Sequence, residues 1–357
     1  MGLPKKIIYK RGSPSLLSGT ILITFQWMEI AMENKFAIQL KKGNRSFREF
    51  GVLMVLLGIV VVLSITAPSF LRAQNLINIV RQMTEIGIMA IGMTMIIVCA
   101  EIDLSIGSIY GATAMMAALL IKDGISPTLA FIIAIAAGAA IGFINGFLST
   151  KAKMPAFIVT LGTMQIFRSV AYAVSGGRSI GAFSKEAQSS WFFGIGGNIG
   201  PIPIQIIIMI ALYIIAFVIM KKTKLGFDIY ATGGNKRAAK LAGINTDRMK
   251  IVSFVVMGAL AAFAGIISIA YLKSVPTTAG SGREMDVIAA VILGGTSMSG
   301  GRGTILGTFL GAAIMAVVRN GMVLLSVPAF WQSGFIGIII IAAVLMDTWI
   351  TQRKSVR

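Results

Sequence analysis

The stretch GISPTLAFIIAIAAGAAIGFINGFLST, residues 124–150, contains no Asp, Glu, Lys or Arg. A helix needs about 20 apolar residues to cross the hydrocarbon core of a membrane, and this run exceeds that length. Further charge-free runs occupy 50–71, 86–100, 104–121, 201–220, 251–272, 303–318 and 330–346, and shorter apolar segments lie near 156–174 and 286–298. Together these runs predict about ten membrane-spanning helices.

Composition points to the same class of protein. The chain is 56% hydrophobic and 13% charged, with a mean hydropathy of +0.86. In lipid, only helices and closed barrels satisfy every backbone hydrogen bond, and runs of this length do not fit the short alternating strands of a barrel. The expected fold is therefore an all-α polytopic membrane protein.

The distribution of basic residues predicts the topology. The formal net charge is +19, and most of the 32 Lys and Arg residues fall in 1–50, 151–153, 221–250, Arg302 and the C-terminal tail. Loops rich in Lys and Arg stay in the cytoplasm, so both termini and these loops are predicted to be cytoplasmic. Because the cations are split among loops rather than gathered on one surface, a nucleic-acid partner is not expected.

Two residue types and one motif are informative by their rarity or absence. The chain contains no histidine, and Cys99 is its only cysteine. An intramolecular disulfide, a Cys/His metal site and the usual His-activated nucleophiles are therefore excluded. No G-x-x-x-x-G-K-[ST] phosphate-binding loop occurs in the sequence. We expect no cofactor bound by this chain and no catalytic residues, so any ATP hydrolysis must take place on another subunit.

The segment GGNKRAAKLAGINTDRMK, residues 233–250, is strongly basic and lies between apolar runs. Asn235 can cap a helix of about two turns that ends at Gly243, a residue suited to a left-handed stop. Helical spacing places Lys236, Arg237 and Lys240 on one side and Ala238, Ala239, Leu241 and Ala242 on the other. One interpretation is a docking helix, and the other is a loop whose charge only sets topology.

Four ordered segments carry a family resemblance: GIMAIGMTMIIVCAEIDLSIGS (87–108), MPAFIVTLGTMQIFRSVAYAVSGGRSI (154–180), ATGGNKRAAKLAGIN (231–245) and TAGSGREMDVIAAVILGGTSMSGGRGTILGTFLGA (278–312). They resemble corresponding stretches of ribose-type sugar permeases, the membrane-spanning subunits of ATP-binding-cassette importers. The resemblance extends over about residues 50–350. AAKLAG at 238–243 has the spacing of the helix by which such permeases contact their ATPase, although Arg237 stands where many have Glu and their usual Ile-x-Leu-Pro ending is missing.

The resemblance implies a transmembrane permease domain at 50–350 with a cytoplasmic coupling loop at 221–250. Residues 1–49 are then an irregular cytoplasmic extension, for which a functional start at Met28 or Met32 is a hypothesis, and 351–357 are a cytoplasmic tail. It implies a bacterial inner-membrane importer of a small sugar, ribose or a related pentose. Its partners would be an ATP-binding subunit that carries ATP and Mg, a periplasmic sugar-binding protein, a second permease copy and membrane lipid. Permeases for branched-chain amino acids or nucleosides, and an ion-driven secondary sugar transporter, are the alternatives.

The candidate translocation path begins at CAEIDLSIGS, residues 99–108, where Glu101, Asp103 and Ser105 interrupt two apolar runs. Ionisable groups at membrane depth usually face a bundle interior or a water-filled cavity. One interpretation is a broken helix whose polar groups bind sugar hydroxyls, and the other is a tight turn at the cytoplasmic boundary with Asp103 capping the next helix.

Other candidates for the path lie in two further segments. GGTSMSGGRG, residues 294–303, supplies Gly294, Gly295 and Thr296, and spacing from Glu284 to Gly307 similar to that from Glu85 to Gly107 hints at an internal repeat. Close helix packing explains these glycines equally well. The region 154–169 supplies Thr160, Gly162 and Thr163.

Arg168 lies inside an apolar segment, where it either extends towards the periplasm or pairs with a carboxylate such as Asp103. The polar stretches 174–180 and 273–283 are expected to face the periplasm, where they either contact a binding protein or are simply solvated.

Overall fold

The computed structural model describes residues 49–355 of the chain. The description below concerns the compact unit that begins at Gly51. The predicted extension at 1–49 lies outside the described residues except for Glu49, as does the hypothesised start at Met28 or Met32. The tail predicted at 351–357 is not separate, because the last helix continues to Ser355.

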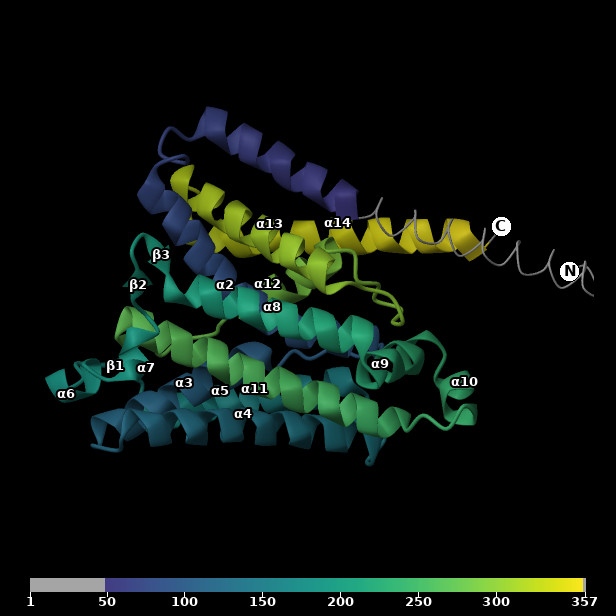
Figure 1. Cartoon of the computed structure of the whole chain (residues 1–357), viewed down its shortest axis with the longest axis horizontal. Coiled ribbons are helices and arrows are strands. Elements are labelled where there is room, and N and C mark those ends of the chain that lie inside the picture. Colours follow the sequence, from purple (N-terminus) through teal and green to yellow (C-terminus); the bar gives the residue numbers. More distant parts are fainter. Residues whose placement is uncertain (1–48, 356–357) are drawn as a thin grey trace, which may run out of the picture. The chain divides into compact units, whose positions relative to one another are not determined.

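Long helices make up most of the fold, as predicted (Figure 1). After a first helix at Glu49–Thr66, they are α2 (Ala73–Val98), α3 (Ile106–Lys122), α4 (Pro127–Thr150), α5 (Ala156–Ser175), α8 (Ile204–Lys222), α11 (Thr246–Leu272), α12 (Arg283–Leu293), α13 (Ile305–Leu324) and α14 (Ala329–Ser355). Shorter helices are α6 (Lys185–Gln188), α7 (Trp191–Gly194), α9 (Lys224–Gly234) and α10 (Lys236–Leu241).

Four two-residue strands complete the fold. β1 (Ile180–Gly181) pairs antiparallel with β4 (Ser274–Val275), and Ile180 lies opposite Val275. β2 (Asn198–Ile199) forms a hairpin with β3 (Ile202–Pro203). The first pair joins the segment after α5 to the segment after α11, so it ties two distant parts of the chain together.

Seven of the described helices are long and apolar enough to cross a membrane: Glu49–Thr66, α2, α4, α5, α8, α11 and α13. α3 and the Ala329–Leu345 part of α14 are shorter apolar helices. α12 has only 11 residues and is about 16 Å long at 1.5 Å per residue, too short to span the hydrocarbon core alone. The prediction of about ten spans therefore includes α3, α12 and α14, whose apolar lengths alone do not show that they cross a membrane.

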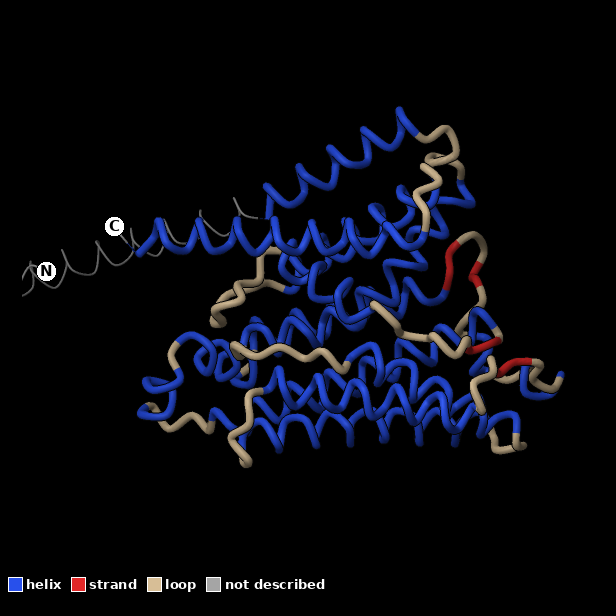
Figure 2. Tube along the Cα trace, turned by 180° about the vertical axis from the view of Figure 1, so that it is seen from behind, coloured by secondary structure: helices blue, strands red, loops and turns tan. Residues whose placement is uncertain are grey.

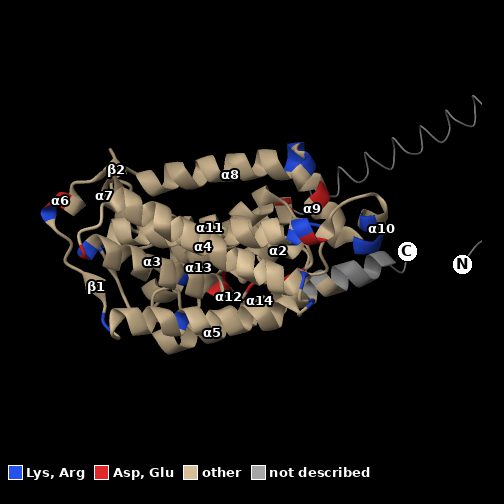
Figure 3. Ribbon diagram, turned by 90° about the horizontal axis from the view of Figure 1, so that it is seen from below, with Lys and Arg blue, Asp and Glu red and all other residues tan. Residues whose placement is uncertain are grey.

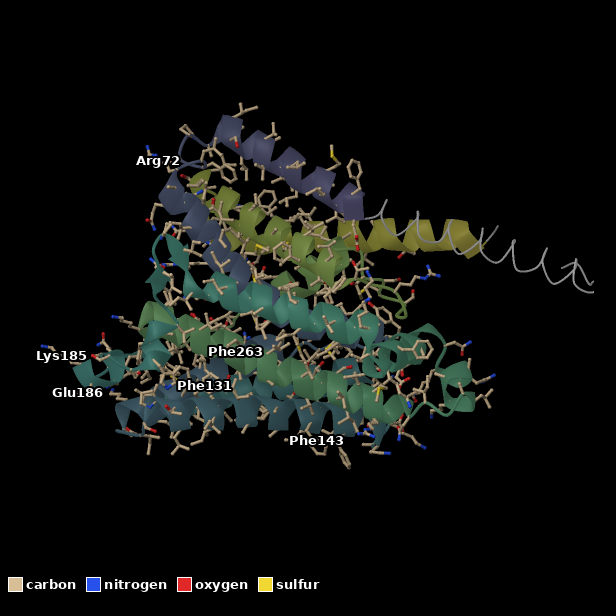
Figure 4. The ribbon with its side chains drawn as sticks, viewed as in Figure 1. Arg72, Phe131, Phe143, Lys185, Glu186 and Phe263 are labelled. Carbon is tan, nitrogen blue, oxygen red and sulfur yellow. The ribbon has the colours of Figure 1, made fainter. Side chains whose placement is uncertain are left out.

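α11 occupies the centre of the unit, where it packs against α2, α3 and α4. Gly138 of α4 faces Gly258 of α11, and Gly142 of α4 faces Phe254 of α11, so closely that a Cβ at any of the three glycines would overlap a backbone carbonyl oxygen. Close helix approach through small residues is typical of membrane bundles. Phe131 and Phe263 join the same two helices with ring centroids 6.0 Å apart in an edge-to-face pair (Figure 4).

The surface of the bundle is apolar along the helices and charged at the ends. Phe143 points away from the bundle in Figure 4 and is 50% exposed, and Ile214 of α8 and Ile341 of α14 are about as exposed. Figure 3 shows Lys, Arg, Asp and Glu gathered mainly at the two ends. Exposed apolar side chains of this size need lipid around them, which agrees with a membrane-spanning fold.

The two ends of the bundle differ, as Figure 2 also shows from behind. α9 and α10 lie at the end where α11 begins, and the end of α4 lies beside them because Gly146 packs against Ile251 and Phe254. We call this the basic end. β1 and β4 lie at the other end, here called the strand end, about 40 Å away along the 27 residues of α11.

Candidate docking surface and interior polar sites

The basic end presents the short helix that the sequence predicts. The Asn235 side chain caps α10 by accepting a hydrogen bond of 3.0 Å from the Ala238 N–H. Gly243 has φ +80°, and its N–H donates to the Lys240 carbonyl at 3.0 Å, while Ile244 N–H donates to the Ala239 carbonyl at 3.0 Å. This is a left-handed glycine stop of the expected kind, so the local structure of the predicted helix is confirmed.

The sides of α10 differ from the prediction. Only Ala239 is buried, whereas Ala238 and Leu241 are exposed together with the cations, and Leu241 is 86% exposed. The apolar and basic groups therefore share the outward surface instead of occupying opposite sides, because a helix of six residues contacts the bundle at a single turn. We define the α10 surface as Lys236, Arg237, Ala238, Lys240 and Leu241.

The sequence analysis did not predict α9. This helix connects the α10 surface to the interior. Gly233 of α9 lies so close to Val98, the last residue of α2, that a Cβ would overlap the Val98 carbonyl oxygen. Val98 also accepts a 2.8 Å hydrogen bond from Gly301 N–H, and Tyr230 Oη donates to the Gly303 carbonyl at 2.8 Å. Residues 294–303, the glycine loop, are thus held between α9 and the end of α2.

Changing Gly233 to Ala is expected to separate α9 from α2 and to lower the free energy of unfolding by about 1–3 kcal/mol, the usual cost of overpacking. The matched control is Gly234→Ala, because a Cβ there meets only Gly301 Cα at 3.8 Å, an ordinary contact. Thermal unfolding of the two purified variants and their sugar uptake in cells provide the measurement. Equal behaviour of both variants would contradict the contact.

The residues predicted at the start of the glycine loop have separate environments. Gly294 follows the last residue of α12 and lies so close to α13 that a Cβ would overlap the Gly307 carbonyl oxygen. This contact agrees with the interpretation of close helix packing. Gly295 has φ +86°. Thr296 is buried, and its Oγ1 has no hydrogen-bond partner within the described part of the chain. Their contact with a transported molecule stays a prediction.

The junction between α2 and α3 lies near the basic end. Glu101 forms an ion pair with Lys250, the fifth residue of α11. Asp103 is fully buried, and its Oδ1 accepts hydrogen bonds from the Ser105 N–H at 2.7 Å and the Ser105 hydroxyl at 2.6 Å. Asn145 Nδ2 then donates to Ser105 Oγ at 2.8 Å. A short turn therefore joins the two helices, but Asp103 does not cap α3 as predicted, because Ser105 is the N-cap residue and makes no side-chain capping hydrogen bond. Contact of Glu101, Asp103 and Ser105 with sugar remains a prediction.

The three candidates on α5 do not share one side of that helix. Thr160 and Thr163 are buried where α5 packs against α3 and α4, and both hydroxyls donate to carbonyls of their own helix. Gly162 is exposed and has open space where a Cβ would stand. Thr160 and Thr163 therefore share a buried environment, and Gly162 lies apart from them.

An interior cluster of charges, which the sequence prediction did not include, lies towards the strand end. Arg283 pairs with Glu85 at 2.8 Å, and Arg319 pairs with the fully buried Asp286 at 2.7 Å. The Tyr110 hydroxyl donates to Glu85 at 3.3 Å. We call these five residues the charged cluster. The four charged members lie within or near the ends of apolar runs, and that signal could have identified them, whereas Tyr110 lies inside a charge-free run and gives no such signal.

Arg168 lies close to this cluster, and it is beside a carboxylate, which is one of the two alternatives that the sequence offered. Its guanidinium is 3.8 Å from Glu284, so the carboxylate beside it is not Asp103. Asp103 instead belongs to the group near the basic end, with Ser105 and Asn145.

The charged cluster borders a cavity of about 430 Å³. Its walls come from α2, α3, α11, α12, α13, α14, β4 and the segment that follows β4. Polar side chains on the walls include Gln82, Glu85, Tyr110, Ser268, Arg283 and Arg319. Small-molecule sites in proteins typically have volumes of about 300–1,000 Å³.

Comparisons with known proteins identify relatives of this chain. The family model described as the permease component of the branched-chain amino acid transport system matches residues 75–344. Ribose import permease protein RbsC is 40% identical in Escherichia coli K12 (83% of this chain, 92% of the relative) and 41% identical in Bacillus subtilis 168 (84% and 92%). An autoinducer 2 import permease, LsrC of Photorhabdus luminescens, is 33% identical (87% and 92%). A solved metal-chelate type ABC transporter has 15% identity and a TM-score of 0.45, covering 85% of this chain and 96% of the other.

Long apolar helices around a central helix, with polar groups enclosed between them, define a polytopic membrane protein of the transporter class. The chain belongs to the binding-protein-dependent permease family that the matching model describes, among its ribose-type import permeases. It is a multi-pass permease subunit of the bacterial inner membrane.

Proposed function

We propose that this chain forms the translocation path for a small neutral sugar, ribose or a related pentose. The observation that carries the proposal is 40–41% identity to ribose import permeases over more than four-fifths of the chain. The interior supports it, because polar and charged groups line a partly open cavity between apolar helices. Such groups are costly in lipid and are typical of a transport pathway.

We propose further that the α10 surface binds a separate ATP-binding subunit, which carries ATP and Mg. Leu241 supplies an exposed apolar anchor, and the three cations around it can pair with acidic groups of the partner. Behind this surface, α9 is held against the glycine loop and the end of α2. A movement of α10 would therefore displace the junction between α2 and α3.

The remaining partners follow from the same proposal. The seven helices of spanning length, together with α3, α12 and α14, would give ten crossings with both termini in the cytoplasm. The strand end, including residues 174–180 and 273–283, would then face a periplasmic sugar-binding protein. A second permease copy and membrane lipid would cover the exposed apolar helices.

Reconstitution tests the proposal directly. The chain is purified in mild detergent, proteins that accompany it are identified, and the assembly is placed in liposomes with its binding protein. We expect an ATP-binding subunit to accompany the chain and labelled ribose to enter only when ATP is supplied. ATP-dependent entry of leucine instead of ribose would favour a branched-chain amino acid permease. Ribose entry driven by an ion gradient without ATP would favour a secondary transporter.

A further inference from the structure

The cavity beside the charged cluster lies at the strand end, far from the α10 surface. Leu272 and Val275, which end α11 and β4, are among its lining residues. The segment 276–282 closes one wall by lying directly on α3, where Gly107 and Gly111 leave room for the backbone of Gly280 and Ala279. Under the proposed topology, this partly open cavity lies at the periplasmic end of the bundle.

The charges at the cavity balance within the protein itself. Glu85 pairs with Arg283 and Asp286 with Arg319, so the two carboxylates and two guanidinium groups sum to zero. An anionic ligand such as a sugar phosphate would add a charge with no free counter-ion. Desolvating an unpaired charge is costly. The electrostatics therefore favour a ligand without net charge.

Hydrogen-bonding groups of both kinds face the space. Ser268 and Tyr110 present hydroxyls, Gln82 presents an amide, and Glu85 presents carboxylate oxygens. Arg319 Nε, a donor, has no hydrogen-bond partner among residues 49–355. Sugar hydroxyls both donate and accept, so one small polyol can satisfy such a mixed set. The Tyr110 ring adds an apolar face beside them.

We propose that this cavity is a binding site for one neutral monosaccharide, held by Glu85, Tyr110, Ser268 and Arg319. The inference rests on the proposed sugar transport and adds the place where sugar is held. The Glu85–Arg283 and Asp286–Arg319 pairs position the polar groups, and segment 276–282 forms the wall on the strand side.

Thiol protection tests the site in the intact transporter in lipid nanodiscs. Ser274→Cys places a thiol on the cavity wall, at a position outside the four sugar-holding residues, and Ser281→Cys places one at its exposed rim. Ser189→Cys is the matched control, since Ser189 is exposed in the α6–α7 segment of the strand end but does not line the cavity. The unmodified chain gives the background, because its single cysteine, Cys99, is buried.

D-ribose at about ten times its Kd is expected to slow labelling of both cavity thiols about tenfold, since about a tenth of the sites stay free. It should leave Ser189→Cys unchanged, and ribose 5-phosphate and leucine should protect neither cavity position. ATP-dependent ribose uptake by the same variants separates the two proposals. Normal uptake without protection would overturn the site alone. Protection by leucine or by ribose 5-phosphate would overturn the assignment of a neutral sugar. Absence of ribose uptake by the unmodified transporter would overturn the proposed function, sugar transport, on which the site rests.

Discussion

Replacing Gly243 with Pro is expected to release the ATP-binding subunit and abolish sugar uptake while the chain stays in the membrane. Gly243 has φ +80°, and its N–H donates to the Lys240 carbonyl. Proline fixes φ near −65° and has no N–H to donate, so it breaks the stop of α10 at a cost of about 3 kcal/mol or more. Copurification of the subunit and ATP-dependent uptake of ribose are the two measurements.

Gly124→Pro is the matched control for this change. Gly124 also has positive φ, +86°, and its N–H donates to the Ile121 carbonyl at 3.2 Å, but it lies in the α3–α4 turn. It therefore carries similar strain away from the basic end. Ala238→Glu supplies a second variant without backbone strain, because Ala238 is exposed on the α10 surface. Retention of the subunit by both α10 variants, or its equal loss from Gly124→Pro, would contradict docking at this surface.

Features set by neighbouring residues could be predicted from the sequence. The charge-free run 124–150 corresponds to α4 at Pro127–Thr150, because absence of charge over such a length leaves few alternatives to a membrane helix. Asn235 and Gly243 delimit α10 because capping depends on residues within one turn. α9 was missed because its 11 residues lie in a connection whose charge dominated the pattern.

Features set by distant residues could not be predicted in this way. Glu85 and Arg283 are 198 positions apart, and Arg168 meets Glu284 rather than Asp103. A single charge in an apolar run shows that a partner is needed, but the partner depends on how the helices pack. The cavity has the same origin, since its walls come from seven elements and the segment after β4. The sequence therefore predicted the short helix α10 and did not predict the charged cluster or the cavity beside it.

Asp286→Ala is expected to destabilise the permease by about 3–5 kcal/mol, because removing one partner of a buried ion pair leaves an uncompensated charge. The Asp286 side chain is fully buried, binds Arg319 at 2.7 Å and lies 3.9 Å from Arg283. Without it, both guanidinium groups compete for Glu85, and the charge balance of the cavity changes from neutral to positive. The measurement is the thermal unfolding midpoint of the purified protein in detergent, together with ribose uptake.

Two further variants separate charge from general damage. Glu186→Ala removes an exposed carboxylate of α6 and should leave the midpoint unchanged within error. The double change Asp286→Ala with Arg319→Met removes the unpaired cation as well, and it should recover part of the lost stability because apolar replacements of buried ion pairs are often tolerated. It should not recover sugar uptake, since Arg319 belongs to the proposed binding site. A single Asp286→Ala variant that unfolds at the wild-type temperature would show that this pair does not hold the interior together.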